Sequence, residues 1–277
     1  MADSPENCNH QCEGCSLAGN CSKQIEKAKM TEGSSAKHVI GVVSGKGGVG
    51  KPTITSLLAC ELAKQGYSVG ILDADITGPS IPYTFNIKTK AYGNEKNQIF
   101  PALSKHLGIK IISSNMLLDN DTDPVIWRGP LVGDMVIQFF SQVVWGDLDY
   151  LLIDMPPGTG DVPLSIFQQI KVDGIVIATT PQSLVSMVVS KACNMAKLMN
   201  IPILGLICNM AYLTCPKCGE KIYLYGDVDL EEMKKEFNIP LTCMLPFDRE
   251  LPSYIDSGQI ENFHTEYLSD FINGMKL

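Results

Sequence analysis

The sequence has no apolar run approaching the roughly 18 residues that a transmembrane helix needs. Its first residues, Met-Ala-Asp-Ser-Pro-Glu-Asn-Cys, contain neither the basic region nor the apolar core of a secretory signal. Positive charge is also scarce, since 22 lysines and arginines face 30 aspartates and glutamates, for a net charge of −8. An acidic surface repels phosphate backbones, which disfavours a general nucleic-acid binder. We therefore expect a cytoplasmic protein with no membrane and no nucleic-acid partner.

Cysteine, in contrast, is abundant. The chain has 277 residues, enough for one large domain with a small appendage, and ten of them are cysteines. Disulfides are rare in a reducing compartment, where clustered cysteines more often bind metal or perform redox chemistry. Two groups are clustered, and four cysteines lie singly in apolar surroundings, where we expect core residues: Cys60, Cys193, Cys208 and Cys243.

The first cysteine group lies in a polar segment without periodicity, residues 1–37, which we predict to be a Cys-rich N-terminal arm. Cys8, Cys12, Cys15 and Cys21 supply four thiolates within fourteen residues. Four thiolates suit either Zn²⁺ or a [4Fe–4S] cluster, and their spacing does not choose between them. The arm is therefore predicted to be a metal site.

Residues 38–277 alternate strand and helix patterns, which predicts one α/β domain. The expected fold is a doubly wound, mostly parallel sheet with helices on both faces. Short runs rich in β-branched residues predict strands at 38–44, 68–73, 150–154, 174–179 and 203–208. Helices are predicted at 51–65, 131–144, 162–170, 183–199, 228–237 and 263–273, with an irregular insertion at 76–126.

A glycine-rich loop joins the first of these strands to the first helix. Strand, glycine loop and helix form the context of a phosphate-binding loop, in which backbone N–H groups converge on an anion at the helix N-terminus. The alternatives are a glycine-rich turn that binds no ligand and, for Lys46, an ordinary solvated surface lysine. Four glycines and two lysines between a strand and a helix favour the phosphate-binding loop over a plain turn. The predicted nucleotide-binding residues are Gly45, Lys46, Gly47, Gly48, Val49, Gly50, Lys51, Pro52 and Thr53.

Pro52 departs from the pattern Gly-x4-Gly-Lys-Ser/Thr. The chain thereby loses a hydroxyl that would ligate Mg²⁺ and an N–H that would bind phosphate. Proline is tolerated in a first helical turn, so folding is expected to survive. Thr53 is an incomplete substitute, because the next helical position points elsewhere.

Three aspartates lie at or just after the ends of two predicted strands: Asp73, Asp75 and Asp154. Ligands bind at the carboxyl ends of strands in parallel sheets, where carboxylates can hold Mg²⁺ and orient an attacking water. Any one of them could merely cap a helix. Three beside a phosphate loop favour a catalytic interpretation.

The second cysteine group is the pair Cys215 and Cys218, in a predicted hairpin near residues 212–226. One pair supplies two ligands, and a tetrahedral site needs two more, most simply from a second subunit across a two-fold axis. A zinc-ribbon half-site and a redox dithiol remain open alternatives on spacing alone.

These motifs resemble one family. Ser44-Gly-Lys-Gly-Gly-Val-Gly-Lys51 resembles the deviant Walker A loop of the MinD/Mrp branch of P-loop ATPases. The segments at 72–80, 127–130, 154–161 and 209–218 look like those of the Mrp/ApbC iron–sulfur carriers. The Cys-rich start resembles the Nbp-type members, although the short gap between Cys8 and Cys12 departs from their eukaryotic form.

The resemblance implies roles for individual residues. Lys46 would reach the nucleotide of a partner subunit, and Lys51 would bind phosphate. Asp75 would orient the hydrolytic water, while Asp73 and Asp154 would support Mg²⁺. The remaining implied roles are an adenine contact by Asn209 and a [4Fe–4S] cluster shared across a homodimer by Cys215 and Cys218.

Three functions are therefore weighed. The first is an ATP-dependent carrier that assembles a [4Fe–4S] cluster and delivers it to apo-proteins. The second is a cluster scaffold that binds nucleotide poorly or does not hydrolyse it, because of Pro52. The third is a MinD- or ParA-like positioning ATPase, which would need a membrane-targeting helix or a basic surface.

Overall fold

The computed structural model describes residues 26–76, 78–95, 97–117, 129–181, 185–226 and 229–275. The predicted metal site at Cys8, Cys12, Cys15 and Cys21 lies outside these residues. Within them, no helix is both long enough and apolar enough to cross a membrane.

A twisted eight-stranded sheet forms the centre of the domain, in the order β12-β9-β8-β1-β7-β2-β6-β5. All neighbouring pairs are parallel except β5 with β6. The chain order therefore reverses about β1, and this reversal places a crevice at the carboxyl ends of the central strands. The strands are β1 (Ser35–Val43), β2 (Val69–Asp73), β5 (Ala102–Leu103), β6 (Lys110–Ile112), β7 (Asp147–Asp154), β8 (Gly174–Thr179), β9 (Ile203–Cys208) and β12 (Thr242–Met244).

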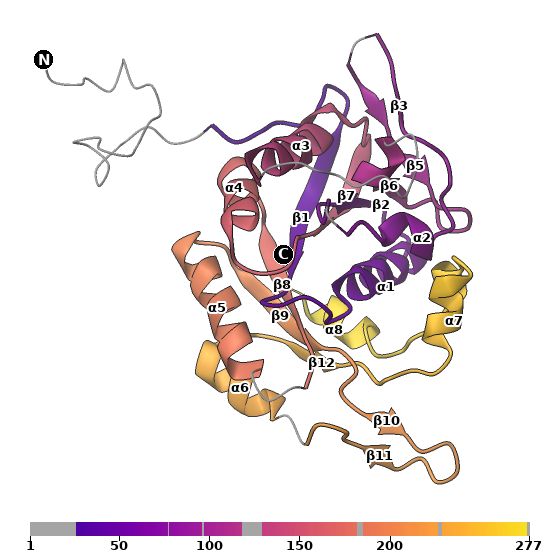
Figure 1. The fold of residues 1–277 in the computed structure, drawn as a ribbon, viewed down its shortest axis with the longest axis vertical. Coiled ribbons are helices and arrows are strands. Elements are labelled where there is room, and N and C mark those ends of the chain that lie inside the picture. The colour runs from indigo at the N-terminus through magenta and orange to yellow at the C-terminus, as the bar shows by residue number, and fades with distance from the viewer. Residues whose placement is uncertain are drawn as a thin grey trace, which may run out of the picture.

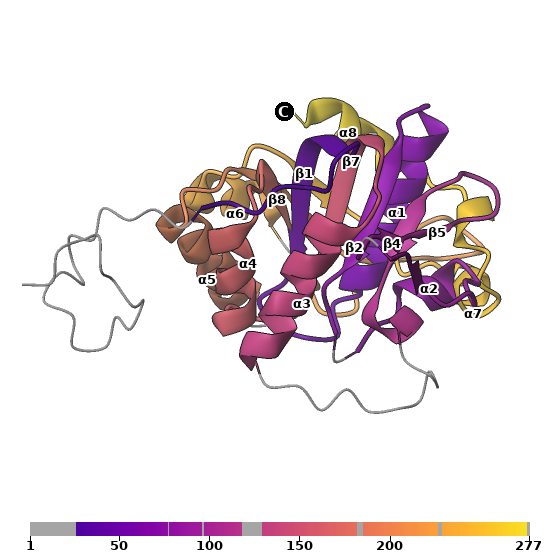
Figure 2. The same ribbon diagram turned by 90° about the horizontal axis from the view of Figure 1, so that it is seen from above.

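Helices cover both faces of this sheet, as predicted. Figure 1 shows α3, α4, α5 and α6 on one side of the strands and α1, α2 and α7 on the other, and Figure 2 shows the same two layers from above. The helices are α1 (Lys51–Lys64), α2 (Ile81–Thr84), α3 (Gly129–Gln142), α4 (Asp161–Gln169), α5 (Val185–Leu198), α6 (Leu230–Phe237), α7 (Leu251–Asp256) and α8 (Ser269–Gly274), with 3₁₀ turns η2 (Ser114–Leu117) and η3 (Ile260–Asn262).

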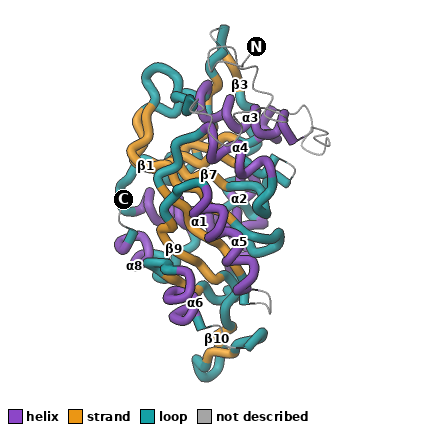
Figure 3. The backbone as a smooth tube through the Cα atoms, turned by 90° about the vertical axis from the view of Figure 1, so that its left-hand side faces the viewer, coloured by secondary structure: helices purple, strands orange, loops and turns teal. Residues whose placement is uncertain are grey.

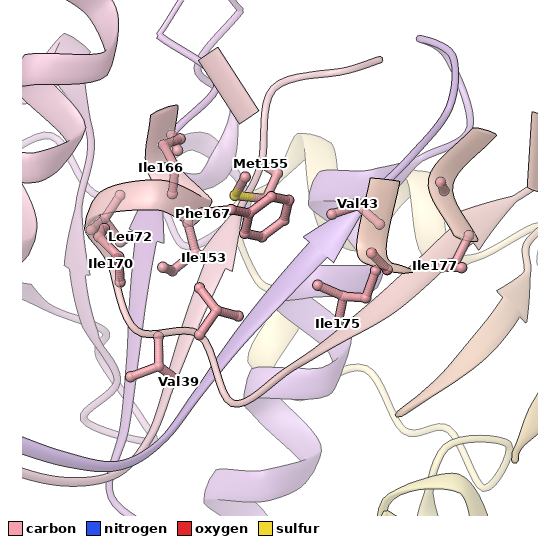
Figure 4. Packing of buried hydrophobic residues seen from close by; sticks show 14 of the residues in the cluster. Val39, Val43, Leu72, Ile153, Met155, Ile166, Phe167, Ile170, Ile175 and Ile177 are labelled. Carbon is pink, nitrogen blue, oxygen red and sulfur yellow. The ribbon is translucent and has the colours of Figure 1, made fainter. Parts of the chain in front are cut away.

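Each face of the sheet buries its own apolar cluster. Because both faces are covered, the central strands are continuous apolar runs rather than alternating ones. Figure 4 shows Ile166 and Phe167 of α4 packed against Ile153 of β7 and against Met155, which follows that strand. Full burial of such side chains contributes about 1.5–3 kcal/mol each, which fixes the strands that carry the site.

The sheet is more extensive than the sequence predicts. β1 begins at Ser35 rather than at residue 38, and β7 begins at Asp147 rather than at residue 150. The expected insertion at 76–126 is not wholly irregular, since it adds β5 and β6 to the main sheet. Strands of two or three residues are too short for a period-two pattern to reveal them.

The predicted helix at 263–273 is wrong in its first half, because only Ser269–Gly274 is helical. Phe263 is extended, with φ −71° and ψ 129°. The Thr265 hydroxyl accepts a hydrogen bond from the Tyr267 N–H at 3.3 Å. Such local bonds let the backbone satisfy itself outside a helix.

Two small hairpins lie at opposite ends of the molecule (Figure 3). One pairs β3 (Tyr92–Gly93) with β4 (Ile99–Phe100). The other pairs β10 (Leu213–Thr214) with β11 (Lys221–Ile222) and carries the Cys215 and Cys218 pair, where a hairpin was predicted.

Candidate functional site

The glycine loop connects the carboxyl end of β1 to the start of α1, at the crevice of the sheet. Gly48 and Gly50 both have φ +77°, which residues with a Cβ rarely adopt. A Cβ on Gly45 would lie 2.4 Å from a Val188 side-chain carbon, and one on Gly50 would lie 2.3 Å from Asn209 Nδ2. Glycine is therefore required at 48 and 50 for the turn, and at 45 and 50 for close packing against α5 and against the residue that follows β9.

Two other glycines leave the loop open on its outer side. A Cβ on Gly47 or Gly48 would meet nothing within 4 Å. Lys46 lies in the same stretch and is partly buried, whereas Val49 is buried beneath the loop. The loop thus presents backbone, rather than bulky side chains, to a ligand outside it.

Helix α1 begins directly after the loop, with Gly50 as its N-cap and Pro52 in its first turn. The Ile54 N–H donates to the Gly50 carbonyl at 3.0 Å, so the helical bonding pattern starts in spite of the proline. Thr53 lies in the same first turn and is partly buried. The N-terminal N–H groups of this turn and the helix dipole make an anion site, reduced by the one donor that Pro52 lacks.

A buried ion pair lies under the loop. Lys51 Nζ is 2.7 Å from Asp154 Oδ2 and 3.9 Å from Asp75 Oδ2. The Lys51 side chain is 4% exposed and that of Asp154 is fully buried. The Thr55 hydroxyl donates to the other Asp154 oxygen at 2.7 Å. Removing one partner of such a pair costs about 3–5 kcal/mol, because the other charge stays buried.

Asp73 lies beside Asp154 on the adjacent strand, as the register of β2 and β7 requires. Its carboxylate accepts hydrogen bonds from the Ser113 hydroxyl at 3.0 Å and from the Asp75 N–H at 3.2 Å. Burial, together with the neighbouring Asp154 charge, raises the pKa of Asp73 to about 8. Burial also raises the pKa of Asp154, against the opposing effect of Lys51.

These raised pKa values mean that ionisation of the two buried carboxyl groups is unfavourable in the folded protein. A carboxyl whose pKa rises on folding takes up a proton on folding, so its contribution to stability falls as pH rises from the unfolded pKa to the folded one. For Asp73 that window runs from 3.8 to about 8. We expect Asp73→Asn to flatten the decline of the unfolding free energy over this window by about 1 kcal/mol per pH unit.

The measurement is urea unfolding of both proteins at several pH values within the window. Asp149→Asn is the matched control, because bonds from Lys37 and Ser68 hold the pKa of Asp149 at about 2, below the window. The control should leave the slope unchanged. An Asp73→Asn slope equal to the wild-type slope would contradict the assignment of buried charge to Asp73.

Asn209 closes the other side of the loop, from the carboxyl end of β9. Its side-chain Nδ2 donates to the Val49 carbonyl at 3.0 Å. Next to it is a narrow pocket whose lining includes Leu57, Pro246, Asp248 and Tyr267.

The Cys215 and Cys218 hairpin extends from the same edge of the sheet, four residues beyond Asn209. The Cys215 N–H donates to the Glu220 carbonyl at 2.8 Å, and the Gly219 N–H donates to the Cys215 carbonyl at 2.9 Å. Gly219 has φ +77°, which turns the chain back into β11. The hairpin therefore holds both thiols at a tight turn, Cys215 partly exposed and Cys218 exposed.

The acidity of its thiol separates Cys215 from the core cysteines. Hydrogen bonds from the Cys218 and Lys217 backbones and from the Cys218 side chain lower the pKa of Cys215. Burial raises the pKa of Cys60 and Cys208 to about 12 and that of Cys193 and Cys243 to about 11. Because the thiolate is the metal ligand, the hairpin is the favoured metal-binding site among the described cysteines.

Two residues of the site were not predicted from the sequence, Thr55 and Ser113. Thr55 lies one helical turn after Lys51, so its spacing already placed it on the same face. Ser113 follows β6, a strand too short to be predicted. No group of three His, Cys, Asp or Glu side chains among the described residues converges closely enough to hold a metal ion by itself.

The comparisons with known proteins agree with this geometry. A family model described as ParA, NUBPL iron-transfer P-loop NTPase, matches residues 35–273. The iron-sulfur cluster carrier protein of Clostridium perfringens is 44% identical over 262 residues, which are 92% of this chain and 92% of the relative. A nucleotide-binding protein of Archaeoglobus fulgidus, solved in complex with ADP, is 43% identical with a TM-score of 0.77, covering 85% of this chain and 92% of its own.

The fold is shared more widely than the sequence. The Pyrococcus furiosus cell division ATPase MinD has a TM-score of 0.62 at 18% identity, covering 86% of this chain and 97% of its own. At that identity the likeness supports the fold alone. The predicted doubly wound P-loop fold is confirmed.

Proposed function

The chain belongs to the family of NUBPL iron-transfer P-loop NTPases, and from that premise we propose that it binds ATP and carries an iron–sulfur cluster. The cargo is a [4Fe–4S] cluster, which the protein delivers to recipient apo-proteins in the reducing cytoplasm. The observation that carries the proposal is the hairpin pair of a partly exposed Cys215, whose thiol pKa is lowered, and an exposed Cys218, on the sheet edge that also bears the phosphate loop.

A homodimer follows from counting ligands. One hairpin offers two thiolates, and a [4Fe–4S] cluster takes four. A second copy of the hairpin supplies the other two if the cluster lies on a two-fold axis. The hairpin extends beyond the body of the domain, where another copy can reach it (Figure 3). In the same dimer, Lys46 would reach the partner's nucleotide.

The nucleotide would occupy the crevice between these features. Its phosphates would lie on residues 45–53, with Lys51 as their counter-charge, and its base would lie against Asn209. Asp75 and Asp154 both lie within 3.9 Å of the Lys51 ammonium, and Asp73 lies beside Asp154, so these carboxyl groups could hold a divalent cation. Mg²⁺ commonly binds through one or two carboxylates together with phosphate oxygens and water. When bound, it would neutralise charge on the phosphates, while Asp75 would orient the attacking water.

Nucleotide binding would then control the cluster through the dimer. A ligand shifts an equilibrium only by its different affinity for the two states. The Asn209 contact joins the loop to the segment that begins the hairpin. A change at the phosphate loop would thereby alter how two hairpins meet and how firmly they hold the cluster.

Pro52 supports a second candidate, a scaffold that binds nucleotide without hydrolysing it. The residue removes both a hydroxyl and an N–H from the first turn of α1. The cysteine hairpin is unaffected by that change. Turnover measurements on residue 52 variants separate this candidate from the first.

A positioning ATPase has less support in this chain. The last helix, α8, has six residues, and its Phe271 and Ile272 are buried in the core. It is therefore a packing helix rather than a membrane anchor. The net charge of −8 also opposes DNA binding.

The direct test is analysis of protein purified without oxygen. We expect iron and acid-labile sulfide in equal amounts, a broad visible absorption band, and a dimer by light scattering. Oxygen exposure or chelation should remove the metal and shift the population towards monomer. A monomer that holds zinc and no sulfide would overturn the proposal and favour a zinc-ribbon half-site.

A further inference from the structure

A second cavity, of about 560 Å³, lies away from both the phosphate loop and the hairpin. It is enclosed by the end of α2 and the chain after it, by η2, and by the end of α7. α2 and α7 lie side by side in Figures 1 and 2. Its volume falls within the roughly 300–1,000 Å³ of sites for small organic ligands. None of residues 45–53, 209, 215 or 218 lines it.

The walls of this cavity are fixed by close backbone packing. Asn86 has φ +52°, a left-handed conformation that is uncommon outside glycine. Gly258 has φ +64°, and a Cβ there would lie 2.4 Å from the Cβ of Asn86. The chain segments after α2 and α7 therefore meet directly, which makes the cavity a preformed site rather than a loose gap between helices.

The lining is mixed, and its charge is opposite to that of the whole chain. Ile87, Met116 and Ile255 supply apolar surface. Lys88 and Lys90, in the segment after α2, supply positive charge, and Asp256, at the end of α7, supplies negative charge. Among the described lining residues two lysines outnumber the one aspartate, on a protein of net charge −8. Such a local field attracts anions.

Asn115 of η2 adds an independent sign of a ligand. It lines the cavity, and its side chain is 5% exposed. Its Oδ1 atom has no hydrogen-bond partner within the described part of the chain. A buried polar atom left without a partner is unfavourable, and a hydroxyl or amide donor on a ligand would satisfy it.

We propose that this cavity binds a small organic anion, with an apolar body against Ile87, Met116 and Ile255 and an acidic group at Lys88 and Lys90. A donor group on the ligand would meet Asn115. The site is separate from the nucleotide and cluster sites, so it stands or falls without them.

The test uses 8-anilinonaphthalene-1-sulfonate, a fluorescent anion with an aromatic body, and its neutral counterpart N-phenyl-1-naphthylamine. Excess Mg-ADP keeps the probe from the phosphate loop. We expect the anion to bind more tightly than the neutral analogue. Lys88→Gln with Lys90→Gln should weaken anion binding about tenfold, as expected for the loss of two exposed charge contacts. Thr89→Trp, at an exposed lining position, should block both probes.

The matched control is Lys234→Gln with Lys235→Gln, which removes two lysines from α6 on the other face of the sheet. It should bind the anion as the wild type does. Equal binding of the two probes, or wild-type anion binding by the Lys88 and Lys90 variant, overturns the proposal. Benzoate and phenyl phosphate then compete for the site: displacement by either supports it and identifies the acidic group, and displacement by neither overturns it.

Discussion

Cys215→Ser with Cys218→Ser is expected to abolish delivery of a cluster to an apo-protein, with apo-aconitase activation as the readout. The two thiolates are the only proposed ligands on this hairpin, and a hydroxyl does not replace a thiolate towards iron. Because both side chains lie on a turn at the surface, the fold should be retained. Thermal unfolding of the variant should stay within about 0.5 kcal/mol of the wild type, as for other surface substitutions.

The N-terminal cysteines must be separated from this result. In a chain with Ala at positions 8, 12, 15 and 21, an intact hairpin should still bind about two irons per chain, which is half of a shared [4Fe–4S] cluster. Adding the hairpin change should then remove all iron. Cys193→Ala is the control, since that buried thiol has a pKa of about 11 and should contribute no ligand. Normal cluster delivery by the hairpin variant would refute the carrier proposal.

The parts of the fold that were predicted from the sequence are those set by local pattern. The strands at 174–179 and 203–208 have the predicted bounds, because both are buried apolar runs ended by polar residues. The loop at 45–50 was predicted because its glycines lie between a strand and a helix. The placement of Asp73 and Asp154 at one edge of the sheet followed from a general rule, that parallel strands bring their carboxyl ends to one edge.

The parts that were missed depend on contacts between distant segments. β6 has three residues, and only its pairing with β2 defines it as a strand. Ser113 therefore could not be connected to Asp73 in advance, although its hydroxyl is 3.0 Å from that carboxylate. The helical pattern at 263–268 failed because Phe263 and Leu268 are both buried at a spacing of five, which one face of a helix does not provide.

The described structure also changes the role of Asn209. The family resemblance implied an adenine contact, whereas its side-chain Nδ2 is bonded to Val49 of the loop. A contact with adenine remains a prediction. Through this bond Asn209 also holds the loop in place. Asn209 itself lies on the segment that continues into the cysteine hairpin. The two sites are thus connected by a single short stretch, residues 209–213.

Pro52→Ser is expected to raise the turnover number for ATP hydrolysis about tenfold to a hundredfold, corresponding to about 1.4–2.8 kcal/mol of transition-state stabilisation. The change restores a hydroxyl beside Lys51, where it can ligate Mg²⁺, and an N–H that can bind phosphate. Pro52→Ala is the matched control, because it restores the N–H without the hydroxyl. Its turnover should lie between those of the wild type and Pro52→Ser, and Lys51→Ala gives the background rate.

The same variants decide whether Pro52 affects ATP turnover or only the stability of the fold. Proline restricts the unfolded chain, so Pro52→Ser should lower the unfolding free energy by up to about 1 kcal/mol. A rise in turnover against that loss of stability would assign the effect to the restored groups. Equal and substantial turnover in all three residue 52 proteins would show that the chain hydrolyses ATP without a hydroxyl there. Thr55, already bonded to Asp154 at 2.7 Å, would then be the residue to examine as its replacement.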